Sequence, residues 1–363
     1  LQASYRVENR IPVVHIYGKL ANGESFLIRD QRERPHFYVD RKDEKKTRSA
    51  GATAFHKSTS LSFSGGPLAR VDVVLPTDVP ILRDRLHDAG VATYEADVRF
   101  AVRYLIDRNV RGGCVIDGEA QHSKDAGVDW VFNDPVVEPG QVEFSPKLLS
   151  FDIETDPEAS RLLAISLFGE SLDEVYIVAC DGVTSMPANA VGFPSEAAVL
   201  DAFIEKVRSF DPDVLTGWNV IGFDLRVLDR IARRHGRSFE MGRGSGALRL
   251  RLAEGRFGND QATIPGRVVL DGIDLLRRAY VRMDDYSLDA VARSVLGEGK
   301  LVEGDVRNRA EEILNRYHHD LAGFAAYART DARLAYQILE KLDLINLTVA
   351  RSKLTGMSLD RVA

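Results

Sequence analysis

The sequence contains few cysteines and no long apolar segment, and each absence excludes a class of protein. Its two cysteines, Cys114 and Cys180, lie far apart, and neither belongs to a CxxC pair. A disulfide-stabilised fold and a tetrahedral cysteine zinc site are therefore both excluded. No apolar run approaches the roughly 20 residues that span a bilayer, and residues 1–10 lack the charged-then-apolar pattern of a signal peptide. We therefore expect a protein of the reducing cytoplasm, without a membrane partner.

The sequence also lacks an excess of positive charge. Its 48 Lys and Arg residues stand against 54 Asp and Glu residues, which gives a formal net charge of −6. This balance argues against a surface that coats nucleic acid everywhere, although it leaves room for a local basic groove. Carboxylates that bind divalent cations add to the negative total, yet the occupied site presents positive charge. The net charge therefore does not exclude a metal-dependent nuclease.

The chain length predicts two domains, because 363 residues exceed the roughly 250 to 300 that usually share one core. Short alternating or apolar runs in residues 1–145 indicate a β-rich domain, with its boundary in the segment 133–146, which has three prolines. The segment 41–64, rich in charge, Ser and Thr, is expected to be a solvated loop. Strands are expected over residues 13–17, 25–28, 36–39 and 71–75, and a helix over 80–89.

Residues 146–344 show a different sequence pattern, in which predicted apolar strands alternate with amphipathic helices. Strands are expected over residues 148–153, 162–168, 175–179, 214–216 and 268–270. Helices are expected over residues 195–210, 224–235, 287–296 and, as the long final helix, 321–344. The first three strands should form a meander. The order of elements predicts an α/β domain, with a mixed sheet flanked by helices.

Two carboxylates lie on the first strand of this second domain. Asp152 and Glu154 are two positions apart, so both side chains point to one face, while Phe151 and Ile153 point to the other. One interpretation is a strand end with a solvated acidic face. The other is a cation site, because burying two like charges costs several kcal/mol each unless a cation compensates them.

Two further segments carry acidic residues, one at the start of a helix and one within the long helix. Asp224 lies where a short buried strand passes into a helix, and it could equally be a helix cap or a partner of the helix dipole. Tyr327 and Asp331 are four residues apart, which puts them on the same face of the long helix. Four carboxylates suit two Mg²⁺ or Mn²⁺ ions, which lie about 3.5 to 4 Å apart in sites for in-line displacement at a phosphodiester. The Tyr327 hydroxyl would orient the attacking water.

These three segments resemble the three exonuclease motifs of family-B DNA polymerases, which are DEDD enzymes with a ribonuclease-H-like fold. The matching segments read Phe151-Asp152-Ile153-Glu154-Thr155, Asn219-x-x-x-Phe223-Asp224 and Tyr327-x-x-x-Asp331. The tyrosine variant is indicated, since the histidine type would have His at the position of Ala326. Residues 91–99, 211–228, 266–275, 296–300 and 354–362 further resemble the bacterial DNA polymerase II branch.

The resemblance implies a 3′→5′ proofreading exonuclease that uses two divalent metal ions. It implies that Asp152, Glu154, Asp224 and Asp331 bind the metal and that Tyr327 assists catalysis. It also implies that Asn219 and Phe223 contact the 3′-terminal nucleotides, although the Phe223 ring could equally belong to the core.

The resemblance also implies partners and a cellular place. The implied partners are a single-stranded or frayed 3′ end of DNA, the palm, fingers and thumb domains, and a sliding clamp that binds the rest of the polymerase. No YxDTD-like carboxylate pair of a polymerase palm occurs in the sequence. Residues 345–363 are expected to be a connector toward that palm, packing back on the N-terminal domain. The implied location is the bacterial cytoplasm, at the nucleoid.

Other interpretations remain open at this point. One is an inactive exonuclease-like module that holds DNA or braces a polymerase, and another is a free-standing exonuclease that trims RNA. A Gly-rich stretch carries arginines that either line a path for the phosphate backbone or lie on a solvated loop: Arg243, Arg249, Arg251 and Arg256. His318 and His319 match no motif and are assigned to the surface.

Overall fold

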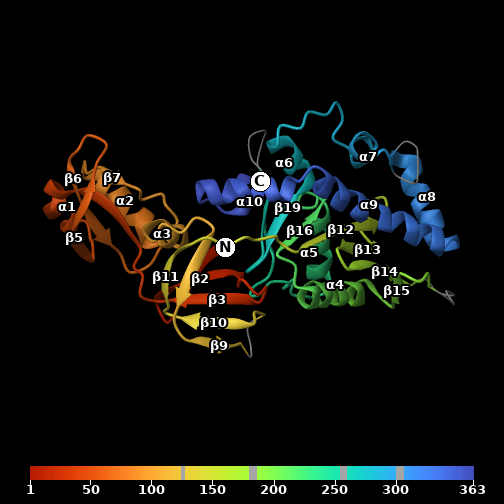
Figure 1. The fold of residues 1–363 in the computed structure, drawn as a ribbon, viewed down its shortest axis with the longest axis horizontal. Helices are drawn as coiled ribbons and strands as arrows, with labels where there is room; N and C mark the ends of the chain where they lie inside the picture. The colour runs from red at the N-terminus through yellow and green to blue at the C-terminus, as the bar shows by residue number, and fades with distance from the viewer. Residues whose placement is uncertain (124–126, 180–185, 254–259, 300–305) are drawn as a thin grey trace. The chain divides into compact units, whose positions relative to one another are not determined.

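The computed structural model describes residues 1–123, 127–179, 186–253, 260–299 and 306–363, with the backbone alone for 306–311. Cys180 and Arg256, which the sequence singled out, lie outside the described residues, as does the last residue of the 296–300 segment. The chain forms two compact units, Leu1–Glu143 and Phe144–Ala363 (Figure 1). Within the described ranges, no helix is both long and apolar enough to cross a membrane.

The first unit is rich in β-structure, as predicted. Its larger sheet has the strand order β1-β2-β3-β10-β9, a second sheet has the order β5-β6-β4-β7, and β8 pairs with β11. The strands are β1 (Gln2–Glu8), β2 (Ile11–Lys19), β3 (Ser25–Asp30), β4 (His36–Asp40), β5 (Ala54–Leu61), β6 (Pro67–Asp72), β7 (Thr93–Tyr94), β8 (Gly113–Asp117), β9 (Ala120–His122), β10 (Trp130–Asn133) and β11 (Val136–Gly140). The helices are η1 (Arg41–Asp43), α1 (Glu44–Ser49), α2 (Asp78–Asp88) and α3 (Phe100–Asp107).

The segment 41–64 is not the solvated loop that its composition predicted. It contains η1, α1 and β5, and β5 pairs antiparallel with β6 at the edge of its sheet. Most β5 side chains are exposed, so hydrogen bonds to β6 stabilise this strand where an apolar face would otherwise be needed. Such an edge strand leaves no apolar alternation in the sequence. Similarly, Thr47 is the one buried side chain of α1.

The second unit is built on a six-stranded mixed sheet with the order β15-β14-β13-β12-β16-β19. The predicted meander is its antiparallel part, and β15, β16 and β19 each pair parallel with a neighbour. The strands of the sheet are β12 (Leu148–Thr155), β13 (Leu162–Gly169), β14 (Leu172–Val178), β15 (Ala190–Phe193), β16 (Val214–Gly217) and β19 (Val268–Asp271). A separate hairpin joins β17 (Arg249–Arg251) to β18 (Gln261–Thr263).

Helices cover both faces of this sheet (Figure 1). On one face, α4 (Glu196–Phe210) and α5 (Asp224–Arg234) share a core with Phe151 and Ile153 of β12. The Ser195 hydroxyl caps α4 by accepting the Ala198 N–H. On the other face, α9 (Leu321–Lys341) packs against β12, β13 and β14. The remaining helices are α6 (Gly272–Arg278), α7 (Leu288–Leu296), α8 (Val306–His319), α10 (Leu344–Thr355) and α11 (Leu359–Val362).

The long helix α9 is not the final helix, because it ends at Lys341 and the chain continues as α10 and α11. Asp343 has φ 54°, a left-handed conformation that Asp tolerates and that ends a right-handed helix. Leu344, Leu359 and Ala363 then pack on the core of the second unit beside Leu270. The expected contact of residues 345–363 with the N-terminal domain stays a prediction.

Candidate active site

Strand β12 points its two carboxylates toward α9. Glu154 lies opposite Ala164 on β13, and Asp152 lies opposite Ser166, so each pair shares a face of the sheet. Ala164 belongs to the buried cluster that includes Tyr327 of α9. The solvated-face interpretation is wrong for Glu154, whose side chain is buried, while Asp152 is half-buried.

Asp224 approaches the same strand from the start of α5. The pairing of β12 with β16 ends at Ser150 and Thr216, so the Ile153 amide has no strand partner on that side. The Ile153 N–H instead donates to Asp224 Oδ1 over 3.0 Å. Asp224 is 2% exposed, and burial together with the negative charge of Asp152 raises its pKa well above the ordinary value. A cation at this position would offset both effects.

Helix α9 carries Tyr327 and Asp331 across the sheet. Near Tyr327 the helix packs on residues of β13 and β14, and from Leu334 onward it packs on residues of β16 and β19. Strand β12 lies between β13 and β16, so the intervening Asp331 faces β12. Both side chains are buried, at 3% exposed for Tyr327 and 5% for Asp331.

The four carboxylates therefore come from β12 itself and from two helices, α5 and α9, that approach it. In the part of the chain that the structure describes, no three of them have oxygens that all lie within 4.8 Å of one another. Burying several like charges together is unfavourable unless a cation neutralises them. Mg²⁺ and Mn²⁺ prefer hard oxygen ligands such as carboxylates. The donor set fits these ions, and the raised pKa of Asp224 is the electrostatic sign of a site that is short of positive charge.

The turn between β16 and α5 presents the two predicted substrate contacts. Asn219 is exposed and has φ 59°. The Phe223 ring is 40% exposed, so the interpretation that it belongs to the core is wrong. Both residues lie within five positions of Asp224 on the same turn, where an exposed ring and amide are available to a ligand.

The arginines of the Gly-rich stretch differ in their surroundings. Arg243 is 2% exposed and donates to the carboxylates of Asp211 and Asp213, so it cannot line a phosphate path. Its partners lie 30 and 32 residues earlier in the sequence. Arg249 and Arg251 are exposed on β17. His318 and His319 are exposed, consistent with their assignment to the surface.

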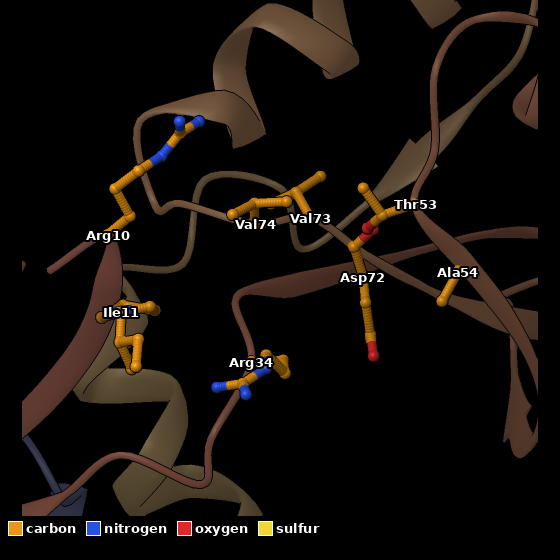
Figure 2. Close-up of a pocket in the computed structure, with 9 residues that line it drawn as sticks. Arg10, Ile11, Arg34, Thr53, Ala54, Asp72, Val73 and Val74 are labelled. Carbon is orange, nitrogen blue, oxygen red and sulfur yellow. The ribbon is translucent and has the colours of Figure 1, made fainter.

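A hollow of about 360 Å³ lies in the first unit (Figure 2). Its lining is mostly apolar and includes Arg10 and Arg34. Its carboxylate, Asp72, already pairs with Arg70 over 2.7 Å and with His56 over 3.3 Å. One paired carboxylate cannot hold two divalent ions, so this hollow is not the hydrolytic site.

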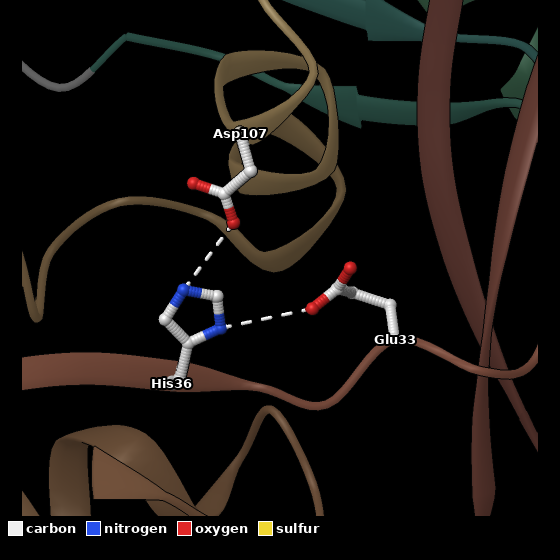
Figure 3. Close-up of side chains that lie close together, drawn as sticks. All are labelled: Glu33, His36 and Asp107. Atoms are coloured by element: carbon white, nitrogen blue, oxygen red, sulfur yellow. Dashed lines mark ion pairs between the residues drawn. The ribbon is translucent and has the colours of Figure 1, made fainter. Parts of the chain in front are cut away.

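The first unit also contains a histidine between two carboxylates. Figure 3 shows Glu33 near one ring nitrogen of His36, at 3.8 Å, and Asp107 near the other, at 3.3 Å. One ligand atom from each of the three residues lies within 4.8 Å of the others, which is the spacing of a possible metal site. Arginines already pair with the same carboxylates: Arg70 and Arg108 with Glu33, and Arg103 with Asp107. This cluster is a charge-balanced network.

The family described as "DNA polymerase family B, exonuclease domain" matches residues 91–291. DNA polymerase II of Escherichia coli (strain K12) is 31% identical over 282 residues, which cover 76% of this chain and 35% of that protein. A DNA polymerase of Thermococcus sp. (strain 9oN-7) is 27% identical, over 99% of this chain and 44% of its own length.

A solved structure shares the fold along the whole chain. It is the family B DNA polymerase from the hyperthermophilic archaeon Pyrobaculum calidifontis, with a TM-score of 0.78 and 22% identity. The match covers 100% of this chain and 47% of that one. The chain thus spans less than half the length of each of these relatives.

Proposed function

Because the chain belongs to family B of the DNA polymerases and carries their exonuclease domain, we propose that it removes nucleotides from the 3′ end of DNA as a metal-dependent proofreading exonuclease. The observation that supports this proposal is the approach to β12, which carries Asp152, of both Asp224 and the helix that carries Asp331, together with the raised pKa of Asp224. Glu154 completes the set.

These four carboxylates would hold two Mg²⁺ or Mn²⁺ ions, which when bound supply activation of water and stabilisation of charge on the phosphoryl group and the leaving 3′ oxygen. The chain's own part is to fix the carboxylates before DNA arrives. The Ile153 amide orients Asp224, the β12–β13 ladder fixes the backbone of Asp152 and Glu154, and the packing of α9 positions Asp331.

Tyr327 and the exposed turn have separate roles in the proposal. The Tyr327 hydroxyl orients the attacking water in line with the scissile bond, since the ring lies one helical turn before Asp331. Phe223 stacks on the terminal base, which requires no base identity, and the Asn219 amide hydrogen-bonds the terminal nucleotides. An end that must reach this site has to unpair, so frayed termini enter at lower cost.

The rest of the polymerase would supply what this chain does not contain. The palm, fingers and thumb of a DNA polymerase II-like enzyme would carry nucleotide incorporation, and a sliding clamp would bind through that part. The proposed setting is the bacterial nucleoid.

The proposal is tested by digesting a 5′-labelled DNA strand with the chain, in Mg²⁺, in Mn²⁺ and in chelator. We expect a ladder of products shortened from the 3′ end, formed faster from single strands and mismatched duplexes than from matched duplexes, and none in chelator. Tight binding of the strand without any shortening would instead support the inactive DNA-holding module. Equal rates on matched and unpaired ends would contradict the unpairing step.

A further inference from the structure

Asp271, which no motif singled out, lies beside the proposed site. It ends β19, next to Gly217 at the end of the parallel strand β16. Its side chain is buried, and its two oxygens accept backbone amides from two different elements. Oδ1 accepts the Ile273 N–H of α6 over 3.0 Å, and Oδ2 accepts the Ile221 N–H over 3.4 Å.

Ile221 belongs to the turn that presents Asn219 and Phe223. The Phe223 N–H donates to the Asn219 carbonyl over 3.0 Å, so this bond closes the turn on itself without attaching it to the sheet. Asn219 has a left-handed φ of 59°, a conformation that Asn adopts more readily than most residues. The bond from Ile221 to Asp271 attaches the middle of the turn to β19.

We infer that Asp271 is a positioning residue for the exonuclease reaction, which holds the 218–223 turn so that Asn219 and Phe223 meet the 3′-terminal nucleotides. This inference rests on the proposed function. Asp271 contacts neither DNA nor metal in this role, and its loss should weaken DNA binding without slowing hydrolysis of bound DNA.

The simpler interpretation is that Asp271 only caps α6, and Asp271→Asn separates the two roles. Asn keeps one carbonyl oxygen for the Ile273 amide and places its NH₂ group against the Ile221 N–H, so the cap survives and the turn loses its hydrogen bond to β19. Ser195→Ala is the matched control, since Ser195 accepts the Ala198 N–H at the start of α4, a different helix from those that flank this turn. Burial and the charge of Asp274 raise the pKa of Asp271 to about 6, so assays are run at pH 8, where the carboxylate is ionised.

The test uses the full chain and two measurements. Anisotropy of a 5′-fluorescein single strand, with Ca²⁺ in place of Mg²⁺, gives the Kd, and cleavage in Mg²⁺ gives kcat and KM. We expect Asp271→Asn to raise Kd and KM by about 3- to 30-fold, the scale of one buried hydrogen bond, with kcat within about twofold of wild type. Ser195→Ala should lower the melting temperature and leave Kd and KM unchanged.

Calorimetric titration with Mn²⁺ completes the test. Asp271→Asn should bind Mn²⁺ like the wild type, because all four proposed ligands remain. Wild-type Kd and KM in Asp271→Asn would overturn the inference, and so would a loss of Mn²⁺ affinity, which would make Asp271 a ligand. If the wild type cleaves no DNA, the proposed function fails, while the Kd comparison still decides the role of Asp271.

Discussion

Tyr327 and Asp331 lie on the same buried face of α9. In the proposal, the Tyr327 hydroxyl orients the attacking water, while the Asp331 carboxylate binds metal. Tyr327→Phe keeps the ring and its packing and removes only that hydroxyl. If the hydroxyl orients the attacking water, the single-turnover rate should fall by about 10- to 1000-fold while Mn²⁺ affinity stays close to wild type. Tyr336→Phe, on the same helix and half-buried against Phe168, is the control and should keep the rate. A wild-type rate in Tyr327→Phe would show that its role here is wrong.

The raised pKa of Asp224 gives the metal-free protein a defined pH dependence. Burial and the neighbouring charges of Asp152 and Asp271 raise this pKa, so folded Asp224 holds its proton more tightly than the unfolded chain does. The resulting stability is present at acid pH and is lost as pH rises through the raised pKa. Asp224→Asn removes this loss. In chelator, the melting temperature of Asp224→Asn minus that of the wild type should therefore increase as pH rises from about 4 to 8. A difference that stays constant with pH would contradict the proposed burial of charge.

At the scale of elements, the close approach of β16 to β12 fixes the strand that carries Asp152. A Cβ added to Gly217 would lie 2.5 Å from the Phe151 carbonyl oxygen, so Gly217→Ala must push the strands apart. We expect a loss of about 1 to 3 kcal/mol in the free energy of unfolding. The cleavage rate should fall further than the unfolded fraction explains, because Asp152 follows Phe151 directly. Urea denaturation beside single-turnover cleavage measures both quantities.

Gly236→Ala is the matched control for this prediction. Gly236 follows α5 with φ 63°, and an added Cβ there would meet nothing within 4 Å. The substitution should cost about 1 to 2 kcal/mol through the left-handed backbone alone. Its cleavage rate should stay at the wild-type value after correction for unfolding. Equal rates in the two variants would mean that the spacing of β12 and β16 does not position Asp152.

Elements with an apolar period were predictable from the sequence, and those without one were not. Strands β12, β13 and β16 and helices α4, α5 and α7 lie where the pattern placed them, since each buries a regular apolar face. The edge strand β5 has no such face. Helix α8 was not predicted, although its described part buries Ile313 and Tyr317 against α9. The break at Asp343 depends on one backbone conformation, which no periodicity reveals.

Part of the candidate site could likewise be predicted from local geometry, and part could not. The shared face of Asp152 and Glu154 follows from strand geometry, and the shared face of Tyr327 and Asp331 follows from helix geometry. Their convergence at β12, like the neighbourhood of β16 and β19 that brings Asp271 to Ile221, requires the order of strands in the sheet. The burial of Arg243 also could not be predicted, because its carboxylate partners come from a distant part of the chain.

At the scale of the whole molecule, each unit has its own tryptophan, Trp130 in the first and Trp218 in the second. Trp130→Phe and Trp218→Phe therefore give chains in which fluorescence follows one unit. Mn²⁺ at about 100 times its Kd should stabilise the unit that binds it by about 2.7 kcal/mol. We expect Mn²⁺ to raise the melting temperature that Trp218 reports in Trp130→Phe. A rise seen only through Trp130 would place the metal in the first unit and contradict the site.

The central claim is that four carboxylates, three of them buried and that of Asp152 half-buried, hold the metal ions used to hydrolyse the 3′ end. Joint measurement of binding and rate tests it most directly. Mn²⁺ calorimetry and single-turnover cleavage are run on the wild type, Asp152→Ala, Asp331→Ala and the control Asp229→Ala, whose carboxylate pairs with Arg233 on α5. We expect the wild type to bind about two ions. Both site variants should lose Mn²⁺ affinity and at least about 100-fold in rate together, while the control keeps both. Near-native binding and cleavage in Asp152→Ala or Asp331→Ala would contradict the claim.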